Sequence, residues 1–499
     1  MERPPRFLSV LPRPARTTSV KGQSAWWARW GGAITFLKLT VFFAGAQTPL
    51  ELQIQFNQRL QARITWSPHS EPALYTLESL DGLSGRWKPI PPAGQWPIED
   101  TTFLDERASF LPTQRFFRVL ADPLPEPPPG QVVSFEKTDS LSRDEVADWL
   151  ARLGISAFQI ESGVELYYVA YETTNASGES VSASGAVITP TDFNRPLPFL
   201  SFQHNVALDR ETVPSRFNFD SLEALIPMLV AAQGFVTAAP DYIGMGDSPG
   251  FHPLFIADAA ANAVADILPI AEKVAQAEGL TVNEELYLLG YGEGGYATMA
   301  AHRSFESDED APYMVTASAA MAGPHDLSGI MLDHLLTPDL IYPEPYLLLY
   351  LLRAYDEQYD LYDNPIEVFT EAVAGQILPR LNGRTPGDTI NELLPSTTPR
   401  DLLQPRFVEA LEADPDHPFR VALRENDVYD WAPQAPIRLY HCEADETVPK
   451  SNSEKALDAF FDNGSGQGQL FDLIPVLEHN ECDGVSFTSA IIWLRDLAN

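Results

Sequence analysis

The segment that constrains this chain most lies near its middle, between Glu285 and Gly295. It reads Glu-Leu-Tyr-Leu-Leu-Gly-Tyr-Gly-Glu-Gly-Gly, and Tyr-Ala-Thr-Met-Ala follows at 296–300. The apolar run predicts a buried strand, the glycines predict a tight turn, and the small residues beyond them predict a closely packed helix. A strand that turns directly into a helix is typical of a mostly parallel sheet with helices on its faces.

The turn has the spacing of a nucleophile elbow, G-x-S-x-G, in which a serine occupies a strained strand-to-helix turn. Gly290, Glu293 and Gly294 fit this pattern, but Gly292 occupies the serine position. Glycine adopts such a conformation at little cost, so a turn without the serine can be stable. The sequence therefore predicts the scaffold of a serine hydrolase that lacks its attacking atom.

Strands and helices alternate on both sides of this turn, which predicts an α/β fold. The other predicted strands are 165–171, 182–189, 197–202, 235–239, 315–321, 437–442 and 470–476, and the other predicted helices are 221–233, 257–277, 451–462 and 486–497. Residues 330–435 break the alternation with a helical insertion rich in Leu and Tyr. Because open α/β sheets bind ligands at the carboxyl ends of their strands, we interpret the insertion as a lid. An ordinary helical subdomain is the alternative.

Two residues carry the rest of the expected chemistry. Asp445 follows the predicted strand 437–442, and His479 follows the predicted strand 470–476. Nucleophile, acid and histidine in this chain order form the triad of a hydrolase of this kind. A carboxylate beside an imidazole fixes its tautomer and stabilises the imidazolium that forms during acyl transfer. Glu443 and Glu446 are the fallback acids.

Several segments carry a resemblance to a known family. They are Pro240–Pro253, the Gly-Tyr-x-Glu-Gly-Gly elbow, Ala322–Ser328, Asn426–Pro433 and Asp445–Pro449. From about residue 131 to residue 499 the chain resembles bacterial secreted esterases related to secretory lipases, within the α/β-hydrolase superfamily. This resemblance implies a carboxylic ester hydrolase that acts on a small acyl or aryl ester and needs no metal and no cofactor.

The chain departs from the family pattern at two positions of the expected site. One is Gly292. The other lies after the strand 197–202, where the pattern is His-Gly and this chain has His204-Asn205. Backbone N–H groups near Asn205 and at Glu293 would form the oxyanion hole, which binds the negative oxygen of the reaction intermediate.

These departures leave three hypotheses for function. The first is a pseudoenzyme that binds an acyl or aryl ligand under the lid, with a purely structural or binding protein as its simplest form. The second is a hydrolase in which His479 activates a water at the space left by Gly292. The third is an ordinary esterase whose glycine is an engineered or erroneous residue.

Ser248 imitates the motif, because Gly246-Asp-Ser-Pro-Gly250 also matches G-x-S-x-G. It lies eight residues beyond the segment Phe235–Pro240 and precedes a proline, so it is not on a strand-to-helix turn. We therefore do not expect it to be a nucleophile. Five other histidines show no metal-ligand spacing; they are His69, His252, His302, His334 and His417.

Two cysteines, Cys442 and Cys482, flank the predicted acid and histidine. In an exported protein this placement predicts a disulfide that links the two loops, with two free buried thiols as the alternative. Export is expected because residues 1–46 combine basic residues, an apolar run and an Ala-Gly-Ala ending, as in a secretory signal peptide. A membrane anchor is the alternative, but the apolar run is short for a span. We expect secretion or a periplasmic location.

Between the predicted signal peptide and the hydrolase region, residues 47–121 alternate apolar and polar side chains. This pattern predicts a small all-β module of the sandwich type. It resembles fibronectin-like modules that end in an Arg-Phe-[Phe/Tyr]-Arg strand, and it would act as a spacer or bind a polysaccharide. Residues 122–130 are a proline-rich linker. The net charge of −36 at pH 7 disfavours nucleic acid and anionic membranes as partners, and we expect no stable membrane insertion. The oligomeric state is left open.

Overall fold

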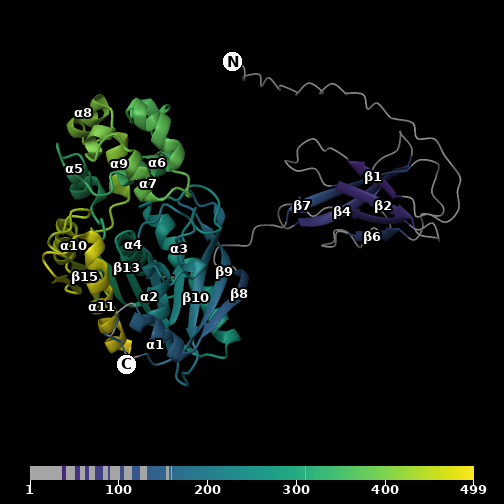
Figure 1. Ribbon diagram of the computed structural model, residues 1–499, viewed down its shortest axis with the longest axis horizontal. Coiled ribbons are helices and arrows are strands. Elements are labelled where there is room, and N and C mark those ends of the chain that lie inside the picture. The colour runs from purple at the N-terminus through teal and green to yellow at the C-terminus, as the bar shows by residue number, and fades with distance from the viewer. Residues whose placement is uncertain are drawn as a thin grey trace, which may run out of the picture. The chain divides into compact units, whose positions relative to one another are not determined.

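The computed structural model describes residues 132–498 except 153–154, 156, 159 and 309–310; before residue 132 it describes only the backbone of seven strands. The chain divides into two compact units, Met1–Pro125 and Glu126–Asn499 (Figure 1). The Ala-Gly-Ala ending, Gln47 and most of the predicted linker lie outside the described residues.

The first unit contains two antiparallel sheets. One is formed by β1 (Phe36–Thr40), β2 (Glu51–Phe56), β3 (Ala62–Trp66) and β6 (Thr102–Asp105); the other is formed by β5 (Lys88–Pro89), β4 (Ala73–Asp81) and β7 (Arg115–Pro123). Strand β1 lies inside the predicted signal peptide and pairs with β2. Cleavage before Gln47 would therefore make β2 an edge strand. The cleavage itself stays a prediction.

The second unit is built on a nine-stranded sheet in the order β16-β15-β14-β13-β11-β12-β10-β9-β8. The six strands from β11 to β16 run parallel, and β10, β9 and β8 extend the sheet in antiparallel fashion. The strands are β8 (Val132–Leu141), β9 (Val164–Thr174), β10 (Ser180–Pro190), β11 (Leu197–Gln203), β12 (Val236–Pro240), β13 (Val282–Tyr291), β14 (Val315–Met321), β15 (Ile437–His441) and β16 (Gly468–Asp472).

Helices cover both faces of this sheet (Figure 1). One face packs against α1 (Arg143–Arg152), α2 (Leu222–Ala231) and α11 (His479–Ala498). The other packs against α3 (Ala257–Ala277), α4 (Glu293–Ser307) and α10 (Ser451–Asp462). Alternate residues of β13 serve the two faces, because Leu286 and Leu288 face α3 whereas Tyr287 and Leu289 face α2 and α11. The predicted α/β-hydrolase fold is confirmed.

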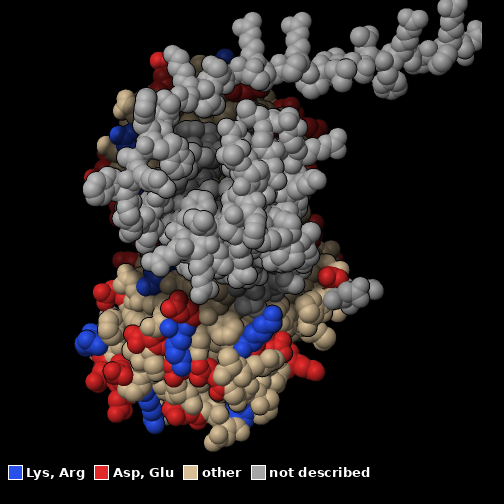
Figure 2. Space-filling model, turned by 90° about the vertical axis from the view of Figure 1, so that its right-hand side faces the viewer, with Lys and Arg blue, Asp and Glu red and all other residues tan. Residues whose placement is uncertain are grey.

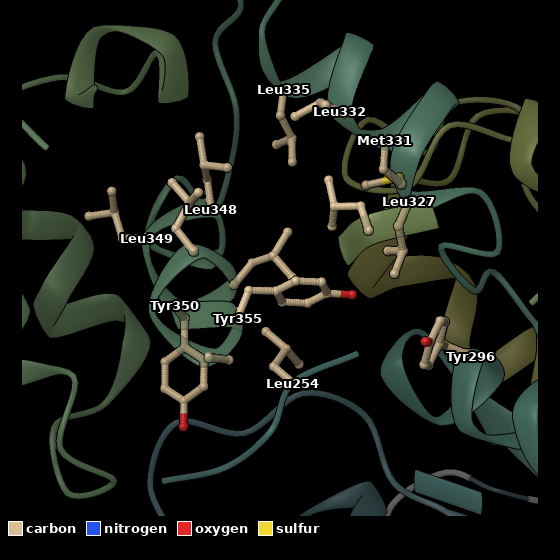
Figure 3. Packing of buried hydrophobic residues seen from close by; sticks show 14 of the residues in the cluster. Leu254, Tyr296, Leu327, Met331, Leu332, Leu335, Leu348, Leu349, Tyr350 and Tyr355 are labelled. Atoms are coloured by element: carbon tan, nitrogen blue, oxygen red, sulfur yellow. The ribbon is translucent and has the colours of Figure 1, made fainter. Parts of the chain in front are cut away.

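The insertion between β14 and β15 is helical and forms the upper layer in Figure 1. Its central helix α6 reads Tyr-Leu-Leu-Leu-Tyr-Leu-Leu at its start and buries most of these side chains among neighbouring leucines and tyrosines (Figure 3). Its elements are η4 (Leu327–Met331), α5 (Leu332–Leu335), α6 (Tyr346–Tyr359), η5 (Pro365–Glu367), η6 (Val373–Ile377), η7 (Leu378–Arg380), α7 (Gly387–Leu393), η8 (Pro399–Leu402), α8 (Pro405–Ala413) and α9 (Pro418–Glu425), and η3 (Pro214–Arg216) precedes α2.

Some predicted elements are wrong in extent, and two are missing from the prediction. Strand β16 ends at Asp472 rather than 476, and Pro475, which has no N–H for a strand ladder, follows the break. Helix α11 begins at His479, so this histidine opens a helix instead of lying in a loop. The prediction did not include strand β8 or helix α1.

No helix among the described residues is long and apolar enough to cross a membrane. On the face shown in Figure 2, acidic and basic side chains are interspersed over the described part of the surface.

Candidate active site

Gly292 joins strand β13 to helix α4 and has a left-handed backbone, with φ of 59° and ψ of −118°. Only glycine adopts this region without strain. Its two elbow neighbours are glycines for a different reason. A Cβ on Gly290 would overlap the Gly294 carbonyl, and a Cβ on Gly294 would overlap the carbonyl of Gln203. The turn therefore depends on a positive φ at Gly292 and on close backbone approach at Gly290 and Gly294.

The sheet topology brings a second loop beside this turn. Strands β11 and β13 are parallel neighbours, with Gln203 opposite Gly290, and β12 lies on the other side of β11. The chain thus changes direction between β11 and β13, which is where open α/β sheets bind ligands. As a result His204 and Asn205, which follow β11, lie next to Gly292.

The side chain of Asn205 fills the space in which a serine would stand. A Cβ added to Gly292 would overlap Asn205 Oδ1 and lie 2.8 Å from Asn205 Cγ. Real carbon contacts of this kind are longer, so a serine at 292 requires the Asn205 side chain to move.

Asn205 Oδ1 also accepts two backbone hydrogen bonds. Val206 N–H donates to it at 2.7 Å, and Glu293 N–H donates to it at 3.1 Å. Two converging N–H groups are the donors of an oxyanion hole. The N–H groups of Glu293 and Val206 converge in this way, and the acceptor that they share here is the Asn205 amide oxygen. Val206 was not foreseen, because a backbone donor leaves no signal in the residue type.

His479 and Asp445 form a buried pair. Nδ1 of His479 lies 2.7 Å from Oδ2 of Asp445, so the imidazole donates and the carboxylate accepts. The other oxygen of Asp445 accepts from the N–H groups of Thr447 and Val448 at 3.1 and 2.8 Å. The Tyr291 hydroxyl donates to the His479 carbonyl at 2.7 Å. These contacts fix the tautomer and the position of the imidazole.

The charges of the pair shift both pKa values in opposite directions. Burial opposes the charged form of Asp445, but hydrogen bonds from His441 and His479 outweigh it and hold the pKa of this carboxyl below its usual value. Burial also opposes the charged form of His479. The hydrogen bond to Asp445 and its negative charge outweigh that effect and raise the pKa of His479.

The fallback residues have other partners. Glu443 receives a hydrogen bond from Lys450 Nζ at 2.8 Å. Burial raises the pKa of the Glu446 carboxyl, and its hydrogen bond with Glu478 adds to that rise. Ser248 is buried and its hydroxyl donates to the Ser182 carbonyl at 2.8 Å.

A small apolar cavity connects the pair to the elbow. Its volume is about 40 Å³, enough for about three water molecules. Gly292, Asn205, Val206, Glu293 and His479 form its floor. The residues of its roof belong mainly to the insertion; they include Leu327, Met331, Leu335, Tyr342, Glu344, Leu347 and Leu351. A ligand larger than a few atoms therefore requires this roof to move.

Two contacts hold the roof to the floor. The Tyr342 hydroxyl donates to the Thr447 carbonyl at 2.9 Å. Glu344 lines the cavity together with His479; burial raises the pKa of the Glu344 carboxyl, and the charge of His479 opposes that rise. An acid from the insertion thus lies close to the imidazole, a neighbour that the sequence pattern did not indicate.

A second buried pair lies behind the elbow. Nε2 of His252 is 2.7 Å from Glu293 Oε1, and Nδ1 of His252 is 3.0 Å from the Ile243 carbonyl. The Ile243 carbonyl accepts, and an ionised Glu293 accepts as well, so these two contacts favour the charged form of the imidazole. Burial opposes that charge, but Glu293 outweighs it and raises the pKa of His252. His252 has no metal-ligand spacing in the sequence, and its partner lies 41 residues further along the chain, so the pattern did not single it out.

The disulfide predicted between Cys442 and Cys482 is present, with a Cα–Cα distance of 6.1 Å. Cys442 follows β15 and Cys482 lies in the first turn of α11. The bond therefore links the segments that carry Asp445 and His479. Among the described residues, no group of three or more His, Cys, Asp or Glu side chains is arranged to hold a metal ion.

No family model matches this sequence, and no curated protein matches it either. Solved structures do match. A ligand-bound form of the rice cell wall degrading esterase LipA from Xanthomonas oryzae is 27% identical, with a TM-score of 0.67, and the match covers 74% of this chain and 99% of that one.

Two further structures share the fold at lower identity. A proposed hydrolase from Legionella pneumophila is 24% identical with a TM-score of 0.67, covering 73% of this chain and 97% of that one. Candida antarctica lipase A in its closed state is 17% identical with a TM-score of 0.54, covering 74% and 82%. The chain therefore has the α/β-hydrolase fold and is related to esterases and lipases.

Proposed function

We propose that this chain is a protein of the ester hydrolase type that binds a small acyl or aryl ligand beneath its lid and turns over esters slowly or not at all. The observation that carries this proposal is the position of Asn205. Its amide oxygen accepts from Val206 and Glu293, and its Cγ lies 2.8 Å from the point where a serine Cβ would be. One side chain thus occupies both the nucleophile position and the oxyanion hole.

The lining of the cavity supports an apolar ligand group. Leucine and methionine side chains of η4, α5 and α6 face His479 across a small space. Acyl and aryl groups gain free energy when they leave water for such a lining, about 25 cal/mol for each Å² buried. The imidazole of His479 lines the floor of the cavity and can form a hydrogen bond with a polar end of the ligand.

The same observation weighs against the two alternatives. An esterase with a misassigned glycine would need its serine in a space that Asn205 fills. A water held at Gly292 and activated by His479 would need that space as well. Either alternative therefore requires a different position of the Asn205 side chain.

Two probes test the proposal. A phosphonate that reacts with catalytic serines should leave the protein unlabelled, because no nucleophile is present. A non-reactive ester analogue, such as an alkyl or aryl ketone, should raise the melting temperature, because a ligand that binds only the folded state stabilises it. Labelling by the phosphonate contradicts the proposal.

Matched variants locate the binding. Leu347→Trp fills the cavity from its half-buried roof and should abolish the shift in melting temperature. Leu393→Trp adds the same ring on α7, where the side chain is 48% exposed, and should leave the shift intact. Equal shifts in both variants would assign the binding to another surface.

We also propose that the protein is exported, to the periplasm or beyond the cell. The disulfide supports this location, since such bonds persist in oxidising compartments. The N-terminal β module would then be a spacer or a polysaccharide-binding unit. A pull-down of the intact protein on insoluble plant and bacterial polysaccharides, compared with the chain starting at Glu126, separates these two roles.

A further inference from the structure

A second cleft lies between the insertion and the loop that follows β12. Its volume is about 430 Å³, within the usual range of small-molecule sites. Its walls are formed by Arg210, by residues 250–252, by α6 and by the segment 379–383. The cleft is much larger than the cavity at His479 and has no part in the proposed ester chemistry.

Two arginines from opposite walls define its character. Arg210 belongs to the loop after β11, and Arg353 belongs to α6. Burial raises the pKa of Tyr350, and the charges of both Arg353 and Arg210 oppose that rise. Both guanidinium groups therefore act on the same phenol. Figure 3 shows the Tyr350 side chain turned away from Met331 and Leu335, which face the other cavity.

Backbone carbonyl groups position both arginines. Because carbonyls are neutral, these hydrogen bonds do not cancel the guanidinium charges. Arg210 Nη2 donates to the Gly244 carbonyl at 2.7 Å. Arg353 Nη1 donates to the carbonyls of Leu378 and Leu381 at 2.9 and 3.1 Å. The Arg353 guanidinium also lies 4.6 Å from the centre of the Phe251 ring. Fixed guanidinium groups of this kind bind carboxylates well, because little rotational freedom is lost on binding.

Nearby acids compensate only part of this charge. Glu357 Oε1 lies 3.5 Å from Arg353 Nη2, and its side chain is 56% exposed. Asp247, whose pKa Arg210 helps to lower, pairs with Arg216. His252 is paired with Glu293. Among the described residues, Arg210 Nε has no hydrogen-bond partner. In a chain with a net charge of −36, this cleft retains a positive local charge.

We propose that the cleft binds a small organic carboxylate, with its oxygens shared between Arg210 and Arg353. The carboxylate would displace Glu357 toward solvent, and the organic part would contact Tyr350. Gly250 and Gly383 line the cleft without side chains, and Gly244 is a glycine because a Cβ there would overlap the backbone of Phe251 and His252. This site is independent of whether residue 292 supports catalysis.

Isothermal titration with benzoate and with succinate tests the proposal, using the full chain at constant ionic strength with chloride as the balancing anion. We expect saturable binding of at least one carboxylate. Arg210→Gln should weaken it by about tenfold or more, the usual effect of losing one charged hydrogen bond. Arg424→Gln is the control, because that arginine also donates to a carbonyl, of Pro415, but lies outside the cleft.

A second variant keeps the test decisive if Arg210→Gln does not fold. Arg210→Lys keeps the charge and loses the planar donor group, so it should bind with intermediate affinity if Arg210→Gln proves unstable. Unchanged affinity in the folded Arg210 variants overturns the proposal. So does equal loss in Arg424→Gln. Saturable binding of sulfate alone would also overturn it, because the ligand class would then be an inorganic oxyanion.

Discussion

Restoring the nucleophile tests the relation between Gly292 and Asn205 most directly. Gly292→Ser supplies the missing hydroxyl beside the retained pair of Asp445 and His479, whose Nδ1–Oδ2 distance is 2.7 Å. Loss of the triad serine costs a serine protease about 10⁶-fold in turnover. The single variant should recover only part of this, about 10³-fold over the parent, because the Asn205 side chain, although the serine displaces it, still competes for the oxyanion donors.

The double variant Gly292→Ser/Asn205→Gly should be more active than the single one. Removing the amide frees the N–H groups of Val206 and Glu293, and an oxyanion donor is worth about 10²–10³-fold in turnover. Asn205→Gly alone should stay at background. The excess of the double variant over the product of the two single effects measures their coupling.

Hydrolysis of a short p-nitrophenyl ester gives the rates, and a phosphonate titration counts active sites. His479→Ala in the double variant should return the rate to background. The reasoning is refuted if the double variant is folded and no faster than Gly292→Ser. It is also refuted if Asn205→Gly alone gains activity, because the nucleophile would then lie elsewhere. Serine at a φ of 59° should cost about 1–3 kcal/mol of stability, visible in urea unfolding.

Three other expectations follow from the same contacts. Cys442 and Cys482 should resist alkylation until reductant is added, because they are joined in a disulfide. Loss of the bond in Cys442→Ala/Cys482→Ala should lower the free energy of unfolding by about 3–4 kcal/mol. An intact mass that shows two free thiols would contradict this. The pKa of His479 is raised, so its pairing stabilises the fold at low pH, and this contribution disappears as pH rises through the folded-state pKa. The pKa of Asp445 is lowered, so its contribution is present above about pH 4 and disappears as pH falls. Urea unfolding of wild type against Asp445→Asn should therefore differ most between about pH 4 and 6.5, and a difference independent of pH would contradict the shifts. Edman sequencing of the exported protein should begin at Gln47; a start at Met1 would show that β1 is retained.

The sequence was sufficient for the fold because the elbow and the strand spacing are strong local signals. Gly290 and Gly294 are glycines for close backbone approach, and such positions can be recognised without a structure. The end of β16 was harder. Leu473 and Ile474 are apolar, and only the proline that follows them separates a continuing strand from a helix entrance.

The contents of the site could be predicted only as residue types. The pattern marked Asn205 as unusual, but it could not show that the amide oxygen accepts from Val206 and Glu293. Such a contact depends on the register between β11 and β13, which places two loops from distant parts of the sequence side by side. Glu344 and His252 were missed for the same reason, since their partners lie far away in the chain.

The survival of Asp445 and His479 is not by itself evidence of catalysis. Asp445 accepts from Thr447 and Val448 and lies 3.2 Å from His441 Nε2, so it fixes the loop after β15. Removing one member of a buried pair typically costs about 3–5 kcal/mol, because the other charge is left unpaired. If the proposed function holds, selection for folding alone is therefore sufficient to retain both residues in a chain without the serine. Under the proposed function, the change at both Gly292 and Asn205 carries the argument instead, because Asn205 Oδ1 accepts from the two N–H groups that would otherwise bind an oxyanion.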